Sequence, residues 1–110
     1  MKFAVQERNG FTEVSAHGRL NMISAPMLKA EVSRAIELGH RRLVLNLDET
    51  EFMDSSGLGA LVGCLKAARQ AGGDLRIANV REQVQMVLKL TSMDRILTPY
   101  GDVEDAYRNA

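Results

Sequence analysis

The sequence of 110 residues lacks tryptophan, has only one cysteine and two prolines, and carries no excess of charge of either sign. The single cysteine, Cys64, cannot form an internal disulfide, which fits a reducing compartment. Because 14 basic residues balance 14 acidic residues, a global electrostatic attraction to nucleic acid or to anionic lipid is not expected. We therefore expect no direct contact with nucleic acid.

Long apolar runs are also missing. The longest, residues 58–65, is too short to span a bilayer, and the first residues turn charged by Glu7 without a signal-peptide pattern. These features predict a cytoplasmic protein with no membrane span. Apolar and charged fractions of 45% and 25% are ordinary for a globular protein, so we expect residues 1–110 to form a single domain.

The first third of the chain has the pattern of a hairpin and a helix. Residues 2–8 alternate apolar and polar, Asn9-Gly10 suits a two-residue turn, and a second strand follows up to residue 16. Ser24, followed by a proline, favours the start of a helix with the Ser24 side chain as its cap. Gly39 is placed to end that helix in a left-handed conformation.

The rest of the chain alternates strands and helices. Residues 43–47 form an apolar run typical of a strand buried on both faces, and a polar connection at 48–51 follows. The pattern then predicts a helix to about Gln70, a strand at 75–78 and a third helix around 84–88. Further predictions are a short edge strand at Arg95, Ile96 and Leu97, and a last helix from Asp102 that docks through Val103, Ala106 and Tyr107. The fold class is therefore α/β, with a mixed sheet that opens on an antiparallel hairpin and continues with mostly parallel strands.

The segment 52–59, Phe-Met-Asp-Ser-Ser-Gly-Leu-Gly, places two hydroxyls and a carboxylate where a strand passes into a helix. Asp54, Ser55 and Ser56 are each suited to cap that helix, and capping alone is the plain structural interpretation. A helix N-terminus also accommodates an anion, because its amides are free and its dipole is positive there.

The helix after this segment is unusually rich in glycine. Gly57, Gly59 and Gly63 each cost about 1 kcal/mol relative to alanine inside a helix. Gly59 and Gly63 share one smooth face, which lets another backbone come close. That backbone belongs either to a partner protein or to the same molecule, and the sequence leaves both open.

The same segment resembles the signature of bacterial anti-sigma factor antagonists, members of the STAS domain family. The likeness extends to residues 18–21, 43–47, 72–75, 84–90 and 93–96. It implies a STAS-like domain that binds a serine-kinase anti-sigma factor and so releases a sigma factor, and it implies that the kinase phosphorylates Ser55 to switch this binding off. A separate phosphatase would reverse the switch, and we expect the free protein to be a monomer.

The resemblance implies a partner-binding set at two turns and the helix that follows the second. Family members commonly carry aspartate where this chain has Asn21, and an asparagine can still cap a helix but cannot pair ionically with a cationic group of the partner. The residues implied are Asn21, Ser24, Asp54, Ser55, Ser56, Gly57, Leu58 and Leu61.

Other functions find less support. A STAS subunit that serves as a scaffold in a signalling or lipid-transport complex, without a phosphorylation switch, is the main alternative, and a switch with an output other than a sigma factor is another. The serine hydrolase and phosphate-loop signatures are absent, so we expect no catalytic residues and no cofactor. His17 and His40 lack metal-ligand spacing, and Cys64 is expected to be a buried structural thiol.

Overall fold

The computed structural model, which describes residues 1–108, opens with the predicted hairpin of β1 (Lys2–Arg8) and β2 (Phe11–Leu20). Arg8 pairs with Phe11 across a two-residue turn in which Gly10 has a φ of +92°. Asn9 does not adopt a positive φ, so the glycine alone supplies the unusual backbone angle that this turn needs.

The predicted helix and buried strand follow the hairpin as α1 (Ala25–Glu37) and β3 (Arg42–Met53). Gly39 ends α1 with a φ of +96°, as predicted. The prediction of a polar connection at residues 48–51 was wrong, because β3 continues through them while pairing with β2 alone. Thr50 in this stretch is completely buried, and its hydroxyl donates to the Ala16 carbonyl at 2.9 Å.

The remaining regular elements complete a mixed sheet. Its strand order is β1-β2-β3-β4-β5, and only the β1–β2 pair is antiparallel, so the predicted α/β class and mixed sheet are confirmed. The elements after β3 are α2 (Ser55–Gln70), β4 (Asp74–Ala78), α3 (Glu82–Leu90), the 3-10 turn η1 (Met93–Arg95), β5 (Pro99–Tyr100) and the 3-10 turn η2 (Val103–Asp105).

Residues 93–108 differ most from the prediction. The expected edge strand at residues 95–97 was wrong: η1 takes its place, the Leu97 amide donates to the Met93 carbonyl at 2.9 Å, and the edge strand is β5. Local hydrogen bonds from the Ile96 and Leu97 amides to the Met93 carbonyl take the place of strand pairing here, and the Leu97 side chain still reaches the core. The predicted last helix is only the turn η2, but its docking through Val103, Ala106 and Tyr107 is confirmed, since all three are buried.

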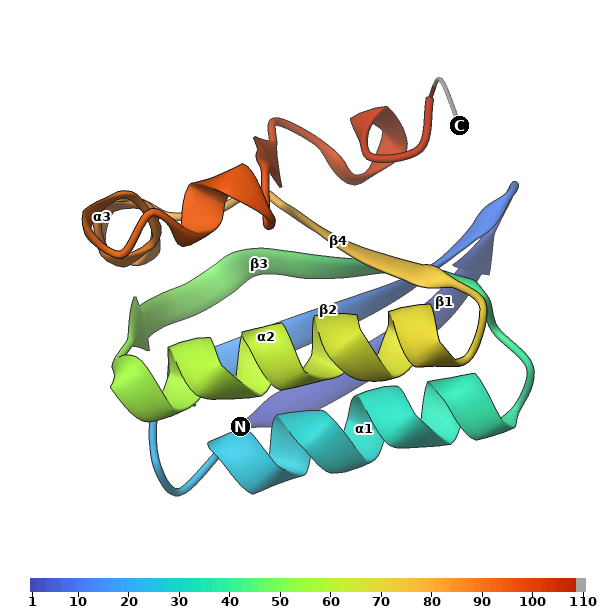
Figure 1. Ribbon diagram of the computed structural model, residues 1–110, viewed down its shortest axis with the longest axis horizontal. Helices are drawn as coiled ribbons and strands as arrows, with labels where there is room; N and C mark the ends of the chain where they lie inside the picture. The colour runs from blue at the N-terminus through green and yellow to red at the C-terminus, as the bar shows by residue number, and fades with distance from the viewer. Residues whose placement is uncertain (109–110) are drawn as a thin grey trace.

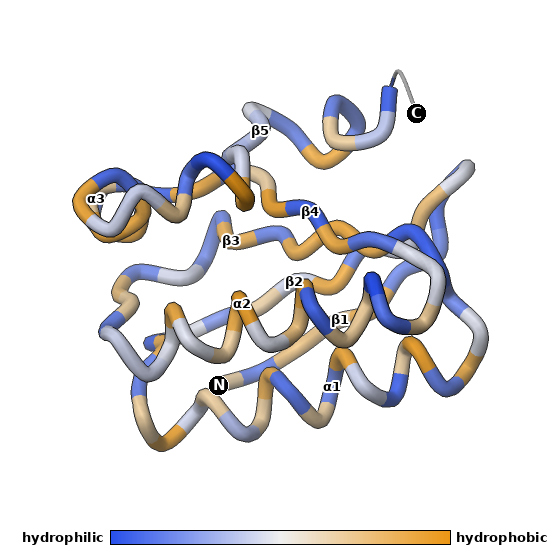
Figure 2. The backbone as a smooth tube through the Cα atoms, viewed as in Figure 1, coloured by the Kyte–Doolittle hydropathy of each residue, from blue (hydrophilic) through white to orange (hydrophobic). Residues whose placement is uncertain are grey.

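Two helices cover one face of the sheet. Figure 1 shows α1 and α2 side by side on that face, with the C-terminal segment on the other side of β4. Hydrophobic residues recur at helical spacing along α1 and α2 (Figure 2), and they form the main core with the alternate residues of β2, β3 and β4. A smaller cluster on the opposite face is covered by the C-terminal segment.

The topology places two turns at the same end of the sheet. Because β2 and β3 are parallel, their carboxyl ends lie at this end, and both α1 and α2 begin there (Figure 1). Within residues 1–108, no helix has the length and apolar composition needed to cross a membrane.

Candidate functional site

The turn from β3 into α2 is capped by Asp54. The Asp54 carboxylate accepts a hydrogen bond from the Gly57 amide at 2.9 Å, and the backbone of Asp54 is extended. Of the three cap candidates in the sequence, the structure therefore selects Asp54, and Ser55 and Ser56 become the first two residues of the helix.

Ser55 is exposed at the positive end of the α2 dipole, while Ser56 is half-buried beside it. Neither hydroxyl forms a hydrogen bond with any atom of residues 1–108 that the structure records. Capping by Asp54 thus leaves the Ser55 hydroxyl available to react with a group from outside the molecule.

The turn from β2 into α1 is built differently. The Ser24 side chain is buried; its hydroxyl donates to the Arg19 carbonyl at 2.6 Å and accepts from the Asn21 amide at 3.0 Å. The expected side-chain cap by Ser24 was wrong, because the Asn21 side chain accepts from the amides of Ile23 and Ser24 instead, at 3.0 and 3.2 Å. Asn21 and Ser24 therefore shape this turn jointly.

The two turns are connected through Leu20, the last residue of β2. The Asp54 amide donates to the Leu20 carbonyl at 3.2 Å. Gly57 packs directly on Leu20: a Cβ at residue 57 would overlap the Leu20 carbonyl oxygen and lie 2.8 Å from Leu20 Cγ. Glycine is required at this position because backbone meets backbone there.

Apolar side chains are exposed around these turns. Met22 and Ile23 are 73% and 79% exposed, and Met27 in the first turn of α1 is 43% exposed. Leu58 is half-buried and Gly59 is exposed in the first turns of α2. We call Met22, Ile23, Met27, Leu58 and Gly59 the apolar surface, since they are the apolar or small residues that are at least partly exposed at the two turns that Leu20 connects.

The predicted contact residues thus fall into two groups. Asn21, Ser55, Ser56 and Leu58 have side chains that reach the surface to different degrees, and Asp54 is half-buried as the cap. By contrast, the buried residues Ser24, Gly57 and Leu61 shape the turns and the core rather than the surface.

The sequence left open whether the glycines of α2 let a backbone of the same molecule or of a partner come close. The structure gives different answers for different glycines. Gly57 packs on the backbone of the same molecule, and a Cβ at Gly63 would lie 3.5 Å from the Lys29 side chain of α1. A Cβ at Gly59 would meet nothing within 4 Å. A separation of 3.5 Å is ordinary van der Waals contact, so packing within the molecule requires glycine at position 57 and not at positions 59 and 63.

Cys64, His17 and His40 are each buried or contact a neighbouring side chain of this protein. Burial raises the pKa of the Cys64 thiol to about 11, against the opposing effect of Lys29, and the side chain is 2% exposed. His17 lies 2.9 Å from Glu49, and His40 Nδ1 lies 3.0 Å from the Thr12 hydroxyl. Residues 1–108 contain no cluster of side chains suited to hold a metal ion.

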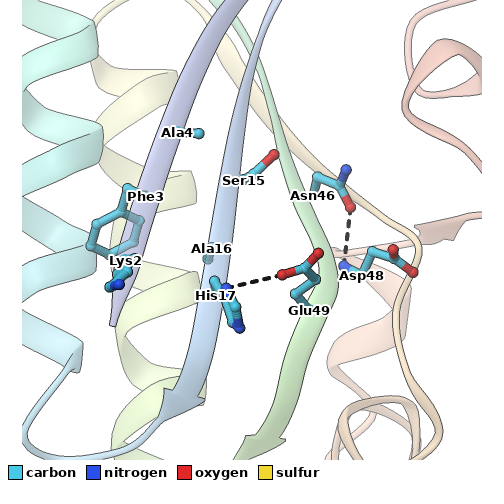
Figure 3. Close-up of a pocket in the computed structure, with 9 residues that line it drawn as sticks. All are labelled: Lys2, Phe3, Ala4, Ser15, Ala16, His17, Asn46, Asp48 and Glu49. Carbon is cyan, nitrogen blue, oxygen red and sulfur yellow. Dashed lines mark hydrogen bonds and ion pairs between the residues drawn. The ribbon is translucent and has the colours of Figure 1, made fainter.

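A polar depression of about 280 Å³ lies on the sheet face opposite α1 and α2. Figure 3 shows its side chains, which pair with one another: His17 with Glu49, and Asn46 with the backbone amide of Asp48 at 3.0 Å. No buried polar side-chain atom among residues 1–108 lacks a hydrogen-bond partner. The depression therefore presents no buried polar group that awaits a ligand.

An α/β domain with an exposed serine at a helix N-terminus, beside apolar residues, has the features of a binding module. The model of the STAS domain matches residues 2–106, and the chain belongs to the STAS domain family.

Relatives of this chain are named anti-sigma factor antagonists. This chain is 27% identical over 107 residues to the anti-sigma F factor antagonist of Paenibacillus polymyxa, and the match covers 96% of this chain and 92% of that protein. It is 31% identical over 87 residues to the anti-sigma-B factor antagonist of Staphylococcus aureus, covering 79% and 81%. The crystal structure of a protein described as an anti-sigma factor antagonist from Thermotoga maritima matches with a TM-score of 0.87 and 28% identity, covering 96% of this chain and 92% of that one.

Gln83 contacts Met53, the last residue of β3, and sequence reasoning missed it. Its side-chain amide accepts from the Met53 amide at 2.8 Å and donates to the Met53 carbonyl at 3.0 Å. The contact joins residues thirty positions apart, and no local pattern signals it.

Proposed function

We propose that this protein is an anti-sigma factor antagonist controlled by phosphorylation of Ser55. In the unphosphorylated form it binds a kinase-type anti-sigma factor through the apolar surface and Asn21, and the sigma factor held by that kinase is released. The names of its relatives support the antagonist role. The observation that carries the switch is the exposed Ser55 hydroxyl, left free because Asp54 caps the helix.

The covalent step is a phosphoryl transfer from ATP. The Ser55 hydroxyl oxygen forms a bond to the γ-phosphorus, the bond from that phosphorus to the β-phosphate oxygen breaks, and ADP leaves. The hydroxyl proton passes to a base of the kinase. A separate phosphatase reverses the switch by hydrolysis: a water oxygen forms a bond to the phosphorus, the bond from phosphorus to the Ser55 oxygen breaks, that oxygen takes up a proton, and inorganic phosphate leaves.

Phosphorylation changes the surface without changing the fold. A phosphate adds nearly two negative charges and three acceptor oxygens at the start of α2, in the turn that Leu20 connects to the turn carrying Met22 and Ile23. Because Ser55 is already exposed at a helix N-terminus, the phosphate remains solvated and the protein stays folded. A partner surface complementary to a neutral apolar patch would have to desolvate that charge, so binding is lost.

The buried members of the predicted set have a supporting role in this proposal. Ser24, Gly57 and Leu61 hold the two turns and α2 in place, while Asn21 presents a neutral amide where family members commonly carry a carboxylate. The partner therefore faces a turn without negative charge. We further propose that the protein acts in the cytoplasm as a monomer when free.

Intact-mass spectrometry with site mapping tests the switch. The protein is incubated with ATP and the kinase-type anti-sigma factor of the same organism, with Ser55→Ala and Ser56→Ala alongside. We expect one phosphate on the wild type and on Ser56→Ala, and none on Ser55→Ala. Binding to the same kinase without any phosphate would contradict the switch and favour a scaffold subunit.

A further inference from the structure

The second half of β3 has a neighbouring strand on one side only. β2 follows β3 as far as the pair Leu20–Met53, whereas β4 stops at the pair Asn46–Ala78. Beyond Asn46, the backbone groups of β3 that point toward β4 have no strand to pair with. A group that binds the last residue of this free edge, Met53, restrains the chain two residues before Ser55.

Gln83 lies beside Met53, the last residue of β3, on the side of the strand that has no neighbouring strand. Its side-chain amide offers one donor and one acceptor, as a peptide group does, and it bonds both the amide and the carbonyl of Met53. The helix that carries Gln83 is firmly docked, since Val84 and Leu88 of α3 are completely buried. Gln83 therefore substitutes for the missing strand at one residue.

The chain that leads to Ser55 is consequently held from two sides. The Asp54 amide donates to Leu20 on the β2 side, and Met53 is bonded to Gln83 on the α3 side. We propose that Gln83 is a positioning residue for Ser55: it fixes the end of β3 so that the serine hydroxyl is presented in one place to the kinase. This inference rests on the proposed function.

Position matters because phosphoryl transfer depends on alignment. The attacking Ser55 oxygen, the γ-phosphorus and the leaving oxygen of ADP must lie roughly in line, and protein groups contribute mainly by placing them. A displacement of about 1 Å can cost on the order of a hundredfold in rate. Loss of the restraint on the α3 side alone, with the contacts to Leu20 and the Asp54 cap intact, should cost less, about tenfold in kcat.

Three variants separate positioning from general stability. Gln83→Ala removes both hydrogen bonds. Gln83→Glu keeps the side-chain length but, when ionised, can only accept from Met53. Gln85→Ala is the matched control, since Gln85 lies in the same helix and is half-buried as Gln83 is, and the structure records no hydrogen bond from its side chain to residues 1–108.

The first measurement is the rate of Ser55 phosphorylation by the kinase-type anti-sigma factor of the same organism, at several concentrations of each variant. We expect Gln83→Ala to lower kcat about tenfold with KM within about twofold of the wild type, because the apolar surface that binds the kinase is unchanged. Gln85→Ala should behave as the wild type.

The second measurement needs no kinase. In nuclear magnetic resonance spectra, Gln83→Glu should shift the amide signals of Asp54 and Ser55 at neutral pH. Protonation of the glutamate below its usual pKa of about 4.3 restores a donor, so the signals should return toward the wild-type positions in acid. Thermal unfolding confirms that each variant is folded.

The outcomes are distinguishable. Wild-type kcat for Gln83→Ala, or Asp54 and Ser55 signals that do not respond to Gln83→Glu, would overturn the inference. A wild-type protein that the kinase does not phosphorylate contradicts the proposed function instead. The spectra then still decide whether Gln83 fixes this segment.

Discussion

Ser24 and Ser55 lie beside the start of the two helices that cover the sheet, and their surroundings are opposite. Ser24 is 4% exposed, and its hydroxyl bonds the carbonyl of Arg19 and the amide of Asn21. Ser55 is exposed, and its hydroxyl bonds nothing among residues 1–108 that the structure records. A serine side chain thus stabilises the turn before α1, whereas the serine at the start of α2 is exposed and can be reached from outside.

The difference comes from which neighbour supplies the cap. Asp54 caps α2 and leaves the serine after it free, whereas Asn21 caps the turn before α1 while Ser24 turns inward to the backbone of β2. A serine near a helix N-terminus is therefore a candidate for modification only where another residue satisfies the helix amides. Substitutions at and around the two turns test that contrast, and their expected effects on stability decrease from Gly57 to Gly59.

Gly57→Ala should have the largest effect. The new methyl group would overlap the Leu20 carbonyl, which is backbone and cannot move without disturbing β2. We expect a loss of about 3 kcal/mol in the free energy of unfolding, at the upper end for overpacking. Urea denaturation followed by circular dichroism measures it, and an unchanged midpoint would show that the two turns are not tightly packed.

The second prediction compares the two serines directly. Ser24→Ala leaves the Arg19 carbonyl and the Asn21 amide without their partner in a partly buried place, which should cost about 1 kcal/mol. Ser55→Ala removes no recorded hydrogen bond and should change the free energy of unfolding by less than about 0.5 kcal/mol. Urea denaturation of both variants tests the contrast, and equal losses of stability would refute it.

Short-range patterns explain how much of this site is visible in the sequence. The Asp-Ser-Ser-Gly turn was predictable because a carboxylate, hydroxyls and a glycine have strong local preferences at the start of a helix. Which of Asp54, Ser55 and Ser56 is the cap was not predictable, since all three residue types are suited to it. The role of Ser24 was missed for the same reason: its partner, the Arg19 carbonyl, depends on the path of the chain.

Longer-range contacts account for the other differences. Residues 48–51 are polar and suggest a connection, yet they extend β3 because β2 supplies a partner for them and buries Thr50. The Gln83–Met53 contact joins two elements that are separated by α2 and β4, so no local signal exists for it. The sheet order was accessible because alternating helices and strands restrict the topology to few possibilities.

The third prediction concerns the stability of the protein in acid, which we expect to depend on Glu13 in β2 rather than on either turn. Burial alone would raise the pKa of Glu13, but hydrogen bonds from Asn46, Arg8 and Ser15 hold that pKa below its usual value. A lowered pKa in the folded state adds stability above the usual pKa of about 4.3, and this stability is lost as the pH falls through the folded-state value.

Glu13→Gln should therefore cost about 1 kcal/mol at neutral pH, and the variant should lose less stability than the wild type when the pH falls from about 5 to about 3. Urea denaturation at a series of pH values measures both effects. Parallel curves for the two proteins would mean that other carboxylates, those near the turns included, account for the acid sensitivity.

Gly59→Ala is expected to have the smallest effect on stability, and of opposite sign to the others. Its methyl group meets nothing within 4 Å, so the change should stabilise α2 by about 0.5–1 kcal/mol through helix propensity alone. The same methyl group protrudes from the apolar surface one turn after Ser55. If the kinase approaches this smooth position closely, its affinity should fall about tenfold, equal to about 1.4 kcal/mol.

The value of Gly59 as a test is that stability and binding should change in opposite directions. Gly57→Ala weakens both, because it disturbs the turn that carries Ser55, and a loss of binding there is uninformative about the surface itself. A more stable Gly59→Ala protein that binds the kinase less tightly, measured by calorimetry beside urea denaturation, would locate the contact. A more stable protein with unchanged affinity would show that the partner does not reach α2 at this position, and the surface would then narrow to Met22, Ile23 and Met27.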